Sequence, residues 1–370
     1  MRRIFGGLAL FLGVALIGLG FLSNPYLYDQ LATVPLDQKP SISPSGNPDE
    51  CEKLPNDCYT SRSEGTGMQV LRLWADADKK AHYDKITDAH VQSTRTVIGI
   101  PGEVPKDDDR IAVWQTGVKS EAVGVGPLTF STEVVTFDRV TGEATGSNLD
   151  VRSAGDLDDP SKMVAVDHAG QFFKFPFNVQ KQTYQFWDGD LGRAVPIEFV
   201  REENLFGTNT FVFQQAIPTA KVASRPVPAA IFDATGEDVQ ADVMYGNTRT
   251  LWVEPATGVI VKGQEVLDRS LVSDLGTVYT TKGTIGYNEK TVKDNAETWG
   301  SKGRLLAFVR DSLKPVGLVV GGLLAIGGLA LLLLGGGRSG TDRSGNGQRP
   351  GDDADGVEGL MSRRQRQSQV

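Results

Sequence analysis

The sequence predicts a mainly β protein in which an extended antiparallel sheet or open barrel-like domain is flanked by one transmembrane α-helix at each end. Two uncharged apolar runs, residues 4–22 and 316–334, supply the helices. Between them, short β-branched and aromatic segments alternate with clusters of Gly, Pro and Asp, which is typical of strands joined by turns. A Thr-Gly pair recurs after several of these segments, and Gly provides the positive φ that tight reversals need.

The first apolar run follows Arg2 and Arg3 and contains 19 residues without a charge. A helix of that length spans about 28 Å, close to the thickness of the bilayer hydrocarbon. A cleaved signal peptide has the same basic start, but its apolar run is usually shorter and ends at a small-x-small site, which residues 23–26 lack. We therefore expect residues 1–22 to form a cytoplasmic stub and a retained anchor.

The second run lies too late in the chain to be a signal peptide and predicts a helix over residues 315–337. The positive-inside rule places Arg2 and Arg3 in the cytoplasm. Two spans then put both termini there and residues 23–314 outside the cytoplasmic membrane. Residues 338–370 are rich in Gly, Asp, Arg, Ser and Gln and are expected to be a disordered cytoplasmic tail.

Small residues recur at helical spacing in both runs. They are Ala9 and Gly13 in the first run, and Gly317, Gly321 and Ala325 in the second. Such spacing lets two backbones approach closely. It predicts pairing of the helices, either within one chain or between the copies of a homo-oligomer.

The region between the two tails, residues 4–337, carries 30 basic and 41 acidic residues, a net charge of −11. This acidity argues against a nucleic-acid partner. A basic collar precedes the second helix at Lys302, Arg304, Arg310 and Lys314. Contact with anionic lipid headgroups is one interpretation of such a collar, and an ordinary membrane flank is the favoured one.

The chain has two cysteines, Cys51 and Cys58. Zinc sites need four ligands, and neither a second cysteine pair nor a nearby histidine is present. Outside the cytoplasm, a local disulfide is the expected state. No metal site is predicted, because the Asp-rich loops lack the spacing of a calcium-binding EF-hand loop.

Strand character is found in several short segments, and a helix within residues 75–91 is an open alternative to strands there. Residues 305–313 are expected to begin the helix that leads into the second span. The segments with strand character are 69–74, 94–100, 111–114, 195–200, 210–213, 248–253, 259–266 and 277–285.

Aromatic residues are concentrated in residues 172–187. Phe173, Phe175 and Phe177 recur with period two and are expected on one face of a strand. Burial in a sheet core is the ordinary explanation. The functional alternative adds Tyr184 and Trp187 as the lining of an apolar ligand groove.

Three segments together resemble the actinobacterial porin PorA family of two-span envelope proteins. They are the turn at 138–142, the aromatic segment from Phe173 to Asp188, and residues 253–259 with Glu265. The resemblance covers nearly the whole chain. It implies an envelope protein with an external β-rich domain, and the family name further implies pore formation.

No catalytic motif or cofactor-binding fingerprint is present in the sequence, and the three histidines are far apart. We therefore expect a non-catalytic, membrane-anchored envelope protein without a cofactor. Our first hypothesis is that it binds or guides an apolar envelope ligand such as lipid. A porin or channel subunit and a passive envelope scaffold are the alternatives.

Overall fold

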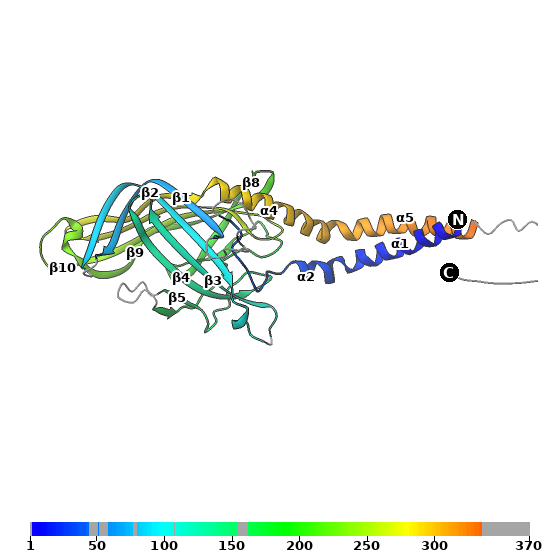
Figure 1. The fold of residues 1–370 in the computed structure, drawn as a ribbon, viewed down its shortest axis with the longest axis horizontal. Coiled ribbons are helices and arrows are strands. Elements are labelled where there is room, and N and C mark those ends of the chain that lie inside the picture. Colours follow the sequence, from blue (N-terminus) through cyan, green and yellow to red (C-terminus); the bar gives the residue numbers. More distant parts are fainter. Residues whose placement is uncertain are drawn as a thin grey trace, which may run out of the picture.

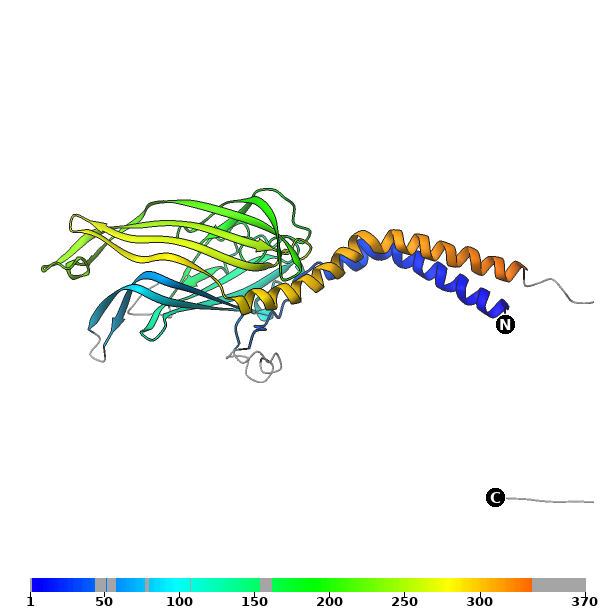
Figure 2. The ribbon, with the colours of Figure 1, turned by 90° about the horizontal axis from the view of Figure 1, so that it is seen from above.

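The computed structural model describes residues 2–43, 51, 58–76, 80–106, 108–153 and 162–334. It consists of a curved β-sheet domain and a pair of long helices that project from one end of it (Figure 1). We call the end of the sheet domain nearest the helices its base. The helices run side by side in both views (Figures 1 and 2). The expected order of helix, β-rich domain and helix is confirmed.

Within the described residues, the strands form one 12-stranded antiparallel meander whose two halves meet where β1 pairs with β12. The order across the sheet is β6-β5-β4-β3-β2-β1-β12-β11-β10-β9-β8-β7. The strands are β1 (Ser61–Ala75), β2 (Ala81–Gly99), β3 (Ile111–Ala122), β4 (Gly126–Asp138), β5 (Val151–Ser153), β6 (Met163–Ala165), β7 (Tyr184–Asp188), β8 (Arg193–Leu205), β9 (Thr208–Pro228), β10 (Asp238–Val253), β11 (Ile260–Ser273) and β12 (Gly276–Tyr287).

The sheet curls until β4 and β7 approach each other at the base. Isolated bridges connect them in steps: Phe137 of β4 pairs with Ala144, Glu143 pairs with Gln171, and Gln171 pairs with Phe186 of β7. At the far end, the Tyr83 hydroxyl donates to the carbonyl oxygen of Ala230 in η4 (Ala229–Phe232). The expectation of an extended sheet or open barrel is therefore confirmed.

Near the base, the inner face of β9 and β10 is apolar, whereas the outer face is mixed and carries the buried Val212 and Trp252 next to polar positions. Leu251 and Val253 of β10 are buried, as is Phe213 of the neighbouring β9. On the opposite face of the same strands, Thr250 lies beside Gln214 and Gln264. Because side chains alternate along a strand, the core residues and these polar residues lie on opposite sides.

Two helices are long and apolar enough to cross a membrane. The first is α1 (Arg2–Leu22), which continues into η1 (Ser23–Tyr28) and α2 (Asp29–Leu31). The second is continuous from Glu289 to Leu334 and comprises α4 (Glu289–Ala307), the π-helical turn η5 (Phe308–Ser312) and α5 (Leu313–Leu334). Pro315 has no N–H for the preceding turn, which accounts for the wider winding at η5.

The small residues predicted to pair the helices do so within one chain. A Cβ on Gly13 would lie 2.5 Å from the carbonyl oxygen of Gly321, and one on Gly317 would lie 2.6 Å from that of Leu16. Gly6 lies against Gly328 and Gly20 against Lys314, so the two helices are antiparallel. We call α1 and α5 together the hairpin.

The structure decides one alternative that the sequence left open and corrects one expectation. Residues 75–91 contain the end of β1 and the start of β2, not a helix, because Val70, Ala89 and Val91 belong to a sheet core. The helix that leads into the second span begins at Glu289, well before residue 305. The Asn288 side chain caps it by accepting from the backbone N–H of Thr291 at 3.0 Å.

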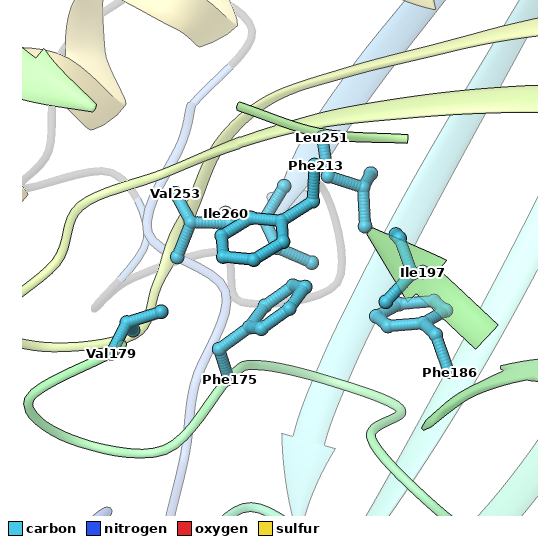
Figure 3. Close-up of a cluster of buried hydrophobic side chains, with 8 residues drawn as sticks. All are labelled: Phe175, Val179, Phe186, Ile197, Phe213, Leu251, Val253 and Ile260. Carbon is cyan, nitrogen blue, oxygen red and sulfur yellow. The ribbon is translucent and has the colours of Figure 1, made fainter. Parts of the chain in front are cut away.

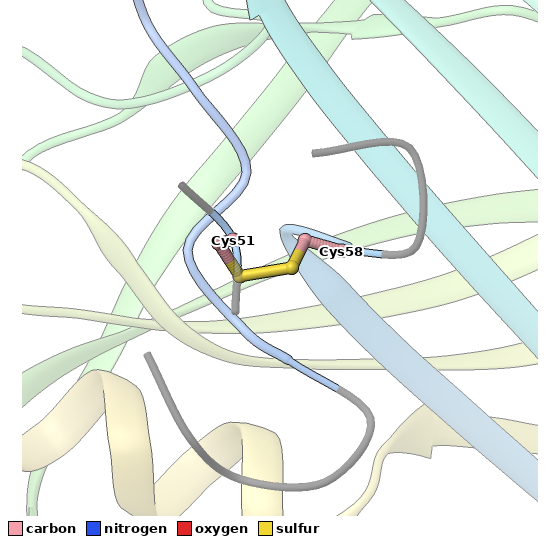
Figure 4. Close-up of a disulfide and its surroundings, with 2 residues drawn as sticks. All are labelled: Cys51 and Cys58. Atoms are coloured by element: carbon pink, nitrogen blue, oxygen red, sulfur yellow. A yellow bond between two sulfur atoms is a disulfide. The ribbon is translucent and has the colours of Figure 1, made fainter. Parts of the chain in front are cut away.

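Cys51 and Cys58 form the predicted disulfide (Figure 4). Tyr59, next to Cys58, pairs through its backbone with Ile42. The predicted tail from residue 338 onward lies outside the described residues.

Candidate functional site

Residues 171–180, which we call the plug, cross the inside of the barrel at its base. Phe175 is fully buried and packs with Phe213, Leu251 and Val253 of the β9–β10 wall (Figure 3). Its ring centroid lies 4.6 Å from that of Phe213. Phe173 packs in the opposite direction, 5.3 Å from the Trp114 ring of β3. The plug therefore fills the space between two walls of the sheet.

Two turns clamp the plug. Both end in a Thr-Gly pair and begin with an acid three residues before the Thr, at 138–142 and 254–258. The backbone N–H of Phe175 donates to the carbonyl oxygen of Gly258 at 2.8 Å, and that of Phe177 donates to the carbonyl oxygen of Val140 at 3.2 Å. The Asn178 and Val179 N–H groups extend the first contact by donating to Ala256 and Pro255. The plug is thus held by backbone bonds from both sides.

Each clamp turn is organised by the carboxylate that begins it. Asp138 accepts from the backbone N–H groups of Val140 and Thr141, both at 2.8 Å. Glu254, which is buried, accepts from the N–H groups of Ala256 and Thr257 and from the Thr257 hydroxyl. Partial burial raises the pKa of Asp138, but these N–H donors and Arg110 outweigh it, so the pKa is lowered.

The glycine that ends each clamp turn leaves room for the plug. Gly142 and Gly258 both have φ of +74°. A Cβ on Gly258 would lie 2.1 Å from the carbonyl oxygen of Phe175, and one on Gly142 would lie 3.0 Å from that of Lys174. The third Thr-Gly turn, at residue 236, has open space around its glycine and does not contact the plug.

Lys174 is the one cation within the plug itself, and it is buried. Its Nζ lies 3.5 Å from the centroid of the Phe177 ring, a cation–π contact. Burial lowers the pKa of Lys174 to about 7, against an opposing effect of Asp138.

A charged cluster lies just beyond the plug, on the side away from the helices. Arg249 donates through Nε to Glu265 at 2.6 Å and through Nη1 to Gln215 at 2.7 Å. The Tyr245 hydroxyl donates to Asp188 at 2.7 Å, and Asp188 lies 3.4 Å from Arg249. Burial raises the pKa of Glu265, but the Arg249 charge and hydrogen bond outweigh it and lower the pKa.

His168, just before the plug, is held between two carboxylates. Its Nδ1 lies 3.0 Å from Asp150 and its Nε2 lies 3.0 Å from Glu133. Burial lowers the pKa of His168, but these two hydrogen bonds and charges outweigh it, and the pKa is raised. The Trp187 ring packs 4.7 Å from the imidazole, so His168 ties the start of the plug to β4 and β7.

The sequence profile of the family Porin PorA matches residues 5–330, which include both helices, all strands and the plug. The chain belongs to the porin PorA family. A relative named Porin PorA from Corynebacterium amycolatum is 25% identical over 403 residues, covering 90% of this chain and 98% of the relative. A second Porin PorA, from Corynebacterium resistens, is 21% identical and covers 90% of this chain and 96% of its own length.

The match to the porin PorA family confirms the resemblance seen in the sequence, and the segments that carried it now have structural roles. Residues 138–142 and 253–259 are the clamp turns, and the segment from Phe173 onward is the plug followed by β7. Glu265 is the partner of Arg249.

The five residues predicted to line a ligand site come together at the base of this porin PorA barrel, but not on one strand face. Phe173 and Phe177 pack in the cluster around Trp114, whereas Phe175 and Tyr184 pack in the cluster around Phe213. The single-face expectation fails because successive plug N–H groups bond to different turns instead of to one neighbouring strand. Trp187 packs with Phe172.

None of these five side chains lines either of two cavities in the described part of the chain. One cavity, of about 710 Å³, lies between α4 and the base, and the other, of about 440 Å³, lies on the outer face of β2–β4. A role of the five residues in holding an apolar ligand remains a prediction.

Sequence reasoning missed the acids that flank His168 and the group around Arg249. Glu133 and Asp150 lie 35 and 18 residues from His168, so no local motif connects them. Among the described residues, no group of three or more His, Cys, Asp or Glu side chains could hold a metal ion.

Proposed function

We propose that this protein is a channel-forming subunit of an envelope membrane and that the plug is its closed gate. The relatives' name supports the porin role. The observation in this chain that supports a gate is the plug itself, which occupies the barrel interior between Phe213 and Trp114. A barrel of this strand number is wider than the eight-stranded barrels that side chains alone fill, so an interior segment is needed to close it.

The hairpin is the proposed membrane-embedded part. Its ionisable residues are confined to the ends, at Arg2, Arg3 and Lys314. Gly13 and Gly321 bring the helices into backbone contact, which leaves no room for water between them. We therefore propose that the membrane path is formed between the hairpins of several copies, and that each barrel covers its entrance.

The antiparallel hairpin supports the topology that we propose. Because Arg2 and Arg3 favour the cytoplasm, both chain ends are placed there and residues 23–314 outside the cytoplasmic membrane. The polar positions on the outer face of the barrel, with Gln214, Thr250 and Gln264 in one row, suit a domain surrounded by water.

Conductance of the purified full-length protein in planar bilayers tests the proposal. We expect discrete current steps, and we expect them to vanish when α5 is replaced by an unrelated apolar helix of equal length. Protein that stays folded and inserted but never conducts would contradict the channel role. Mass spectrometry of retained lipids in the same preparation then separates the two alternatives, since a lipid guide retains lipid and a passive scaffold does not.

A further inference from the structure

The cavity of about 710 Å³ at the base is bounded by two parts of the molecule. One side is the helix that leads to the membrane, with Gly300, Gly303, Arg304 and Arg310. The other side is formed by the end of the plug and the turns at 207–209 and 254–256. Its volume is within the range of small-molecule sites.

Close packing of α4 on the sheet fixes this cavity in place. A Cβ on Gly300 would lie 1.9 Å from the Thr208 hydroxyl oxygen, and one on Gly303 would lie 2.3 Å from the carboxyl carbon of Glu254. The Thr208 hydroxyl also donates to the carbonyl oxygen of Ala296 at 2.8 Å. The cavity wall is therefore a rigid part of the fold.

The cations of the cavity differ in what neutralises them. Lys181 is paired with Glu202, and Arg310 donates to both carboxylate oxygens of Asp311. Arg304 is exposed, and within the described residues no hydrogen bond, ion pair or ring contact holds its guanidinium.

The acid on the cavity lining does not neutralise Arg304. Glu254 also lines the cavity, but its carboxylate accepts three hydrogen bonds from its own turn. Arg304 thus presents a guanidinium fork, which matches the oxygens of a phosphate. The side-chain amide of Gln182, also on the lining, has no partner among the described residues and adds a neutral hydrogen-bond donor.

Exposed apolar side chains lie next in sequence to the cavity-lining residues Arg304 and Ala307, an arrangement that suits a membrane surface. Leu305 and Phe308, on the turn that follows Arg304, are 61% and 44% exposed, and Leu31 of α2 is 52% exposed. Arg310 is three residues before α5 begins, about 5 Å along the helix axis. Large apolar side chains beside a basic residue at this level are typical of the interface between headgroups and hydrocarbon.

We propose that this cavity binds the anionic headgroup of a membrane phospholipid, with Arg304 as the cation that contacts its phosphate. The acyl chains then lie along Leu305 and Phe308 toward the bilayer. The inference rests on the hairpin lying in a membrane and not on conductance, so a protein that fails to conduct leaves it unaffected.

The test uses the full-length protein in a mild non-ionic detergent and counts bound phosphatidylglycerol by native mass spectrometry. Phosphatidylcholine is the zwitterionic comparison, and soluble glycerol 3-phosphate tests for a free anion. Arg304→Gln is compared with Lys302→Gln, which removes the same charge two residues away on the same helix, from a residue outside the cavity lining. Arg304→Lys keeps the charge without the fork.

We expect phosphatidylglycerol to bind more tightly than phosphatidylcholine, and Arg304→Gln to weaken it about fivefold, as for loss of one cation near a membrane surface. Arg304→Lys should be intermediate and Lys302→Gln close to the parent protein. Equal weakening by Arg304→Gln and Lys302→Gln, or equal binding of the two lipids, would overturn the site. Tighter binding of glycerol 3-phosphate than of the lipid would overturn its membrane source.

Discussion

Replacing Gly258 with alanine tests whether the clamp holds the plug. Gly258 has φ of +74°, and Gly207, in the tight turn between β8 and β9, has φ of +82°. Either alanine variant must place an L-residue in the left-handed region, which costs about 1–2 kcal/mol. The surroundings of the two glycines differ. A Cβ on Gly207 meets nothing within 4 Å, whereas one on Gly258 would lie 2.1 Å from the Phe175 carbonyl oxygen.

The additional cost at Gly258 follows from what must move. Real Cβ atoms essentially never come closer than 3.0 Å to such a neighbour, so the plug backbone must shift away. That shift stretches the 2.8 Å hydrogen bond from Phe175 to Gly258, worth about 1 kcal/mol. It also disturbs the packing of Phe175, for which overpacking data suggest about 1–3 kcal/mol. Gly258→Ala should therefore lose roughly 3–6 kcal/mol of unfolding free energy, and Gly207→Ala roughly 1–2 kcal/mol.

Urea unfolding of the purified protein, followed by tryptophan fluorescence, measures the difference. Trp114 and Trp187 both lie beside the plug and report on its release. Equal losses of unfolding free energy in the two variants would refute the clamp. The same two variants test whether the plug is a gate. Gly258→Ala should raise the open probability of the channel in planar bilayers, and Gly207→Ala should leave it unchanged. If Gly258→Ala loosens the plug without changing the open probability, the plug is not the gate.

Three further predictions concern the hairpin and the buried charges. Gly321→Leu should separate α1 from α5, because a Cβ at residue 321 would lie 2.6 Å from the carbonyl oxygen of Gly13. Gly322→Leu is the control, since a Cβ at residue 322 meets nothing within 4 Å. Disulfide cross-linking between the helices should weaken in the first variant and stay unchanged in the second. The raised pKa of His168 stabilises the fold fully below its ordinary value of 6.5, and this contribution is lost as pH rises through the higher folded value. The unfolding free energy of the parent protein relative to His168→Gln should therefore fall as pH rises above 6.5. A difference that stays constant with pH would contradict the stabilisation of protonated His168 by Asp150 and Glu133. Glu265→Gln should lower the unfolding free energy by about 2 kcal/mol, because Arg249 keeps its charge without that partner. Adding Arg249→Met to Glu265→Gln should recover part of this loss, which a double-mutant cycle measures.

The positions of the helices and the identity of the turns could be predicted because local sequence specifies them. An uncharged run such as residues 316–334 has few alternatives to a membrane-spanning helix. A Thr-Gly pair after a β-branched run marks a reversal whatever surrounds it. Strand ends were less predictable: β9 extends from Thr208 to Pro228, far beyond the segment expected at 210–213, because pairing with β10 stabilises residues whose own pattern is weak.

The plug shows where local patterns mislead. Phe173, Phe175 and Phe177 have the spacing of a strand face, but Pro176 donates no hydrogen bond and the neighbouring N–H groups bond to turns more than a hundred residues apart. The aromatic composition correctly indicated a core. The direction of each ring depends on which wall it meets, and that is a tertiary property.

By itself, the sequence determined two apolar helices long enough to cross a membrane, a β-rich domain between them, a disulfide and the family. These follow from hydropathy, alternation and motif, each readable within a short window. Only the tertiary structure decided that Gly13 meets Gly321 in one chain and that two distant turns clamp one plug. It also decided that Arg304 faces a cavity with no carboxylate partner among the described residues. The physical reason is that close approach and charge neutralisation depend on distances between segments, which the fold fixes and local sequence does not.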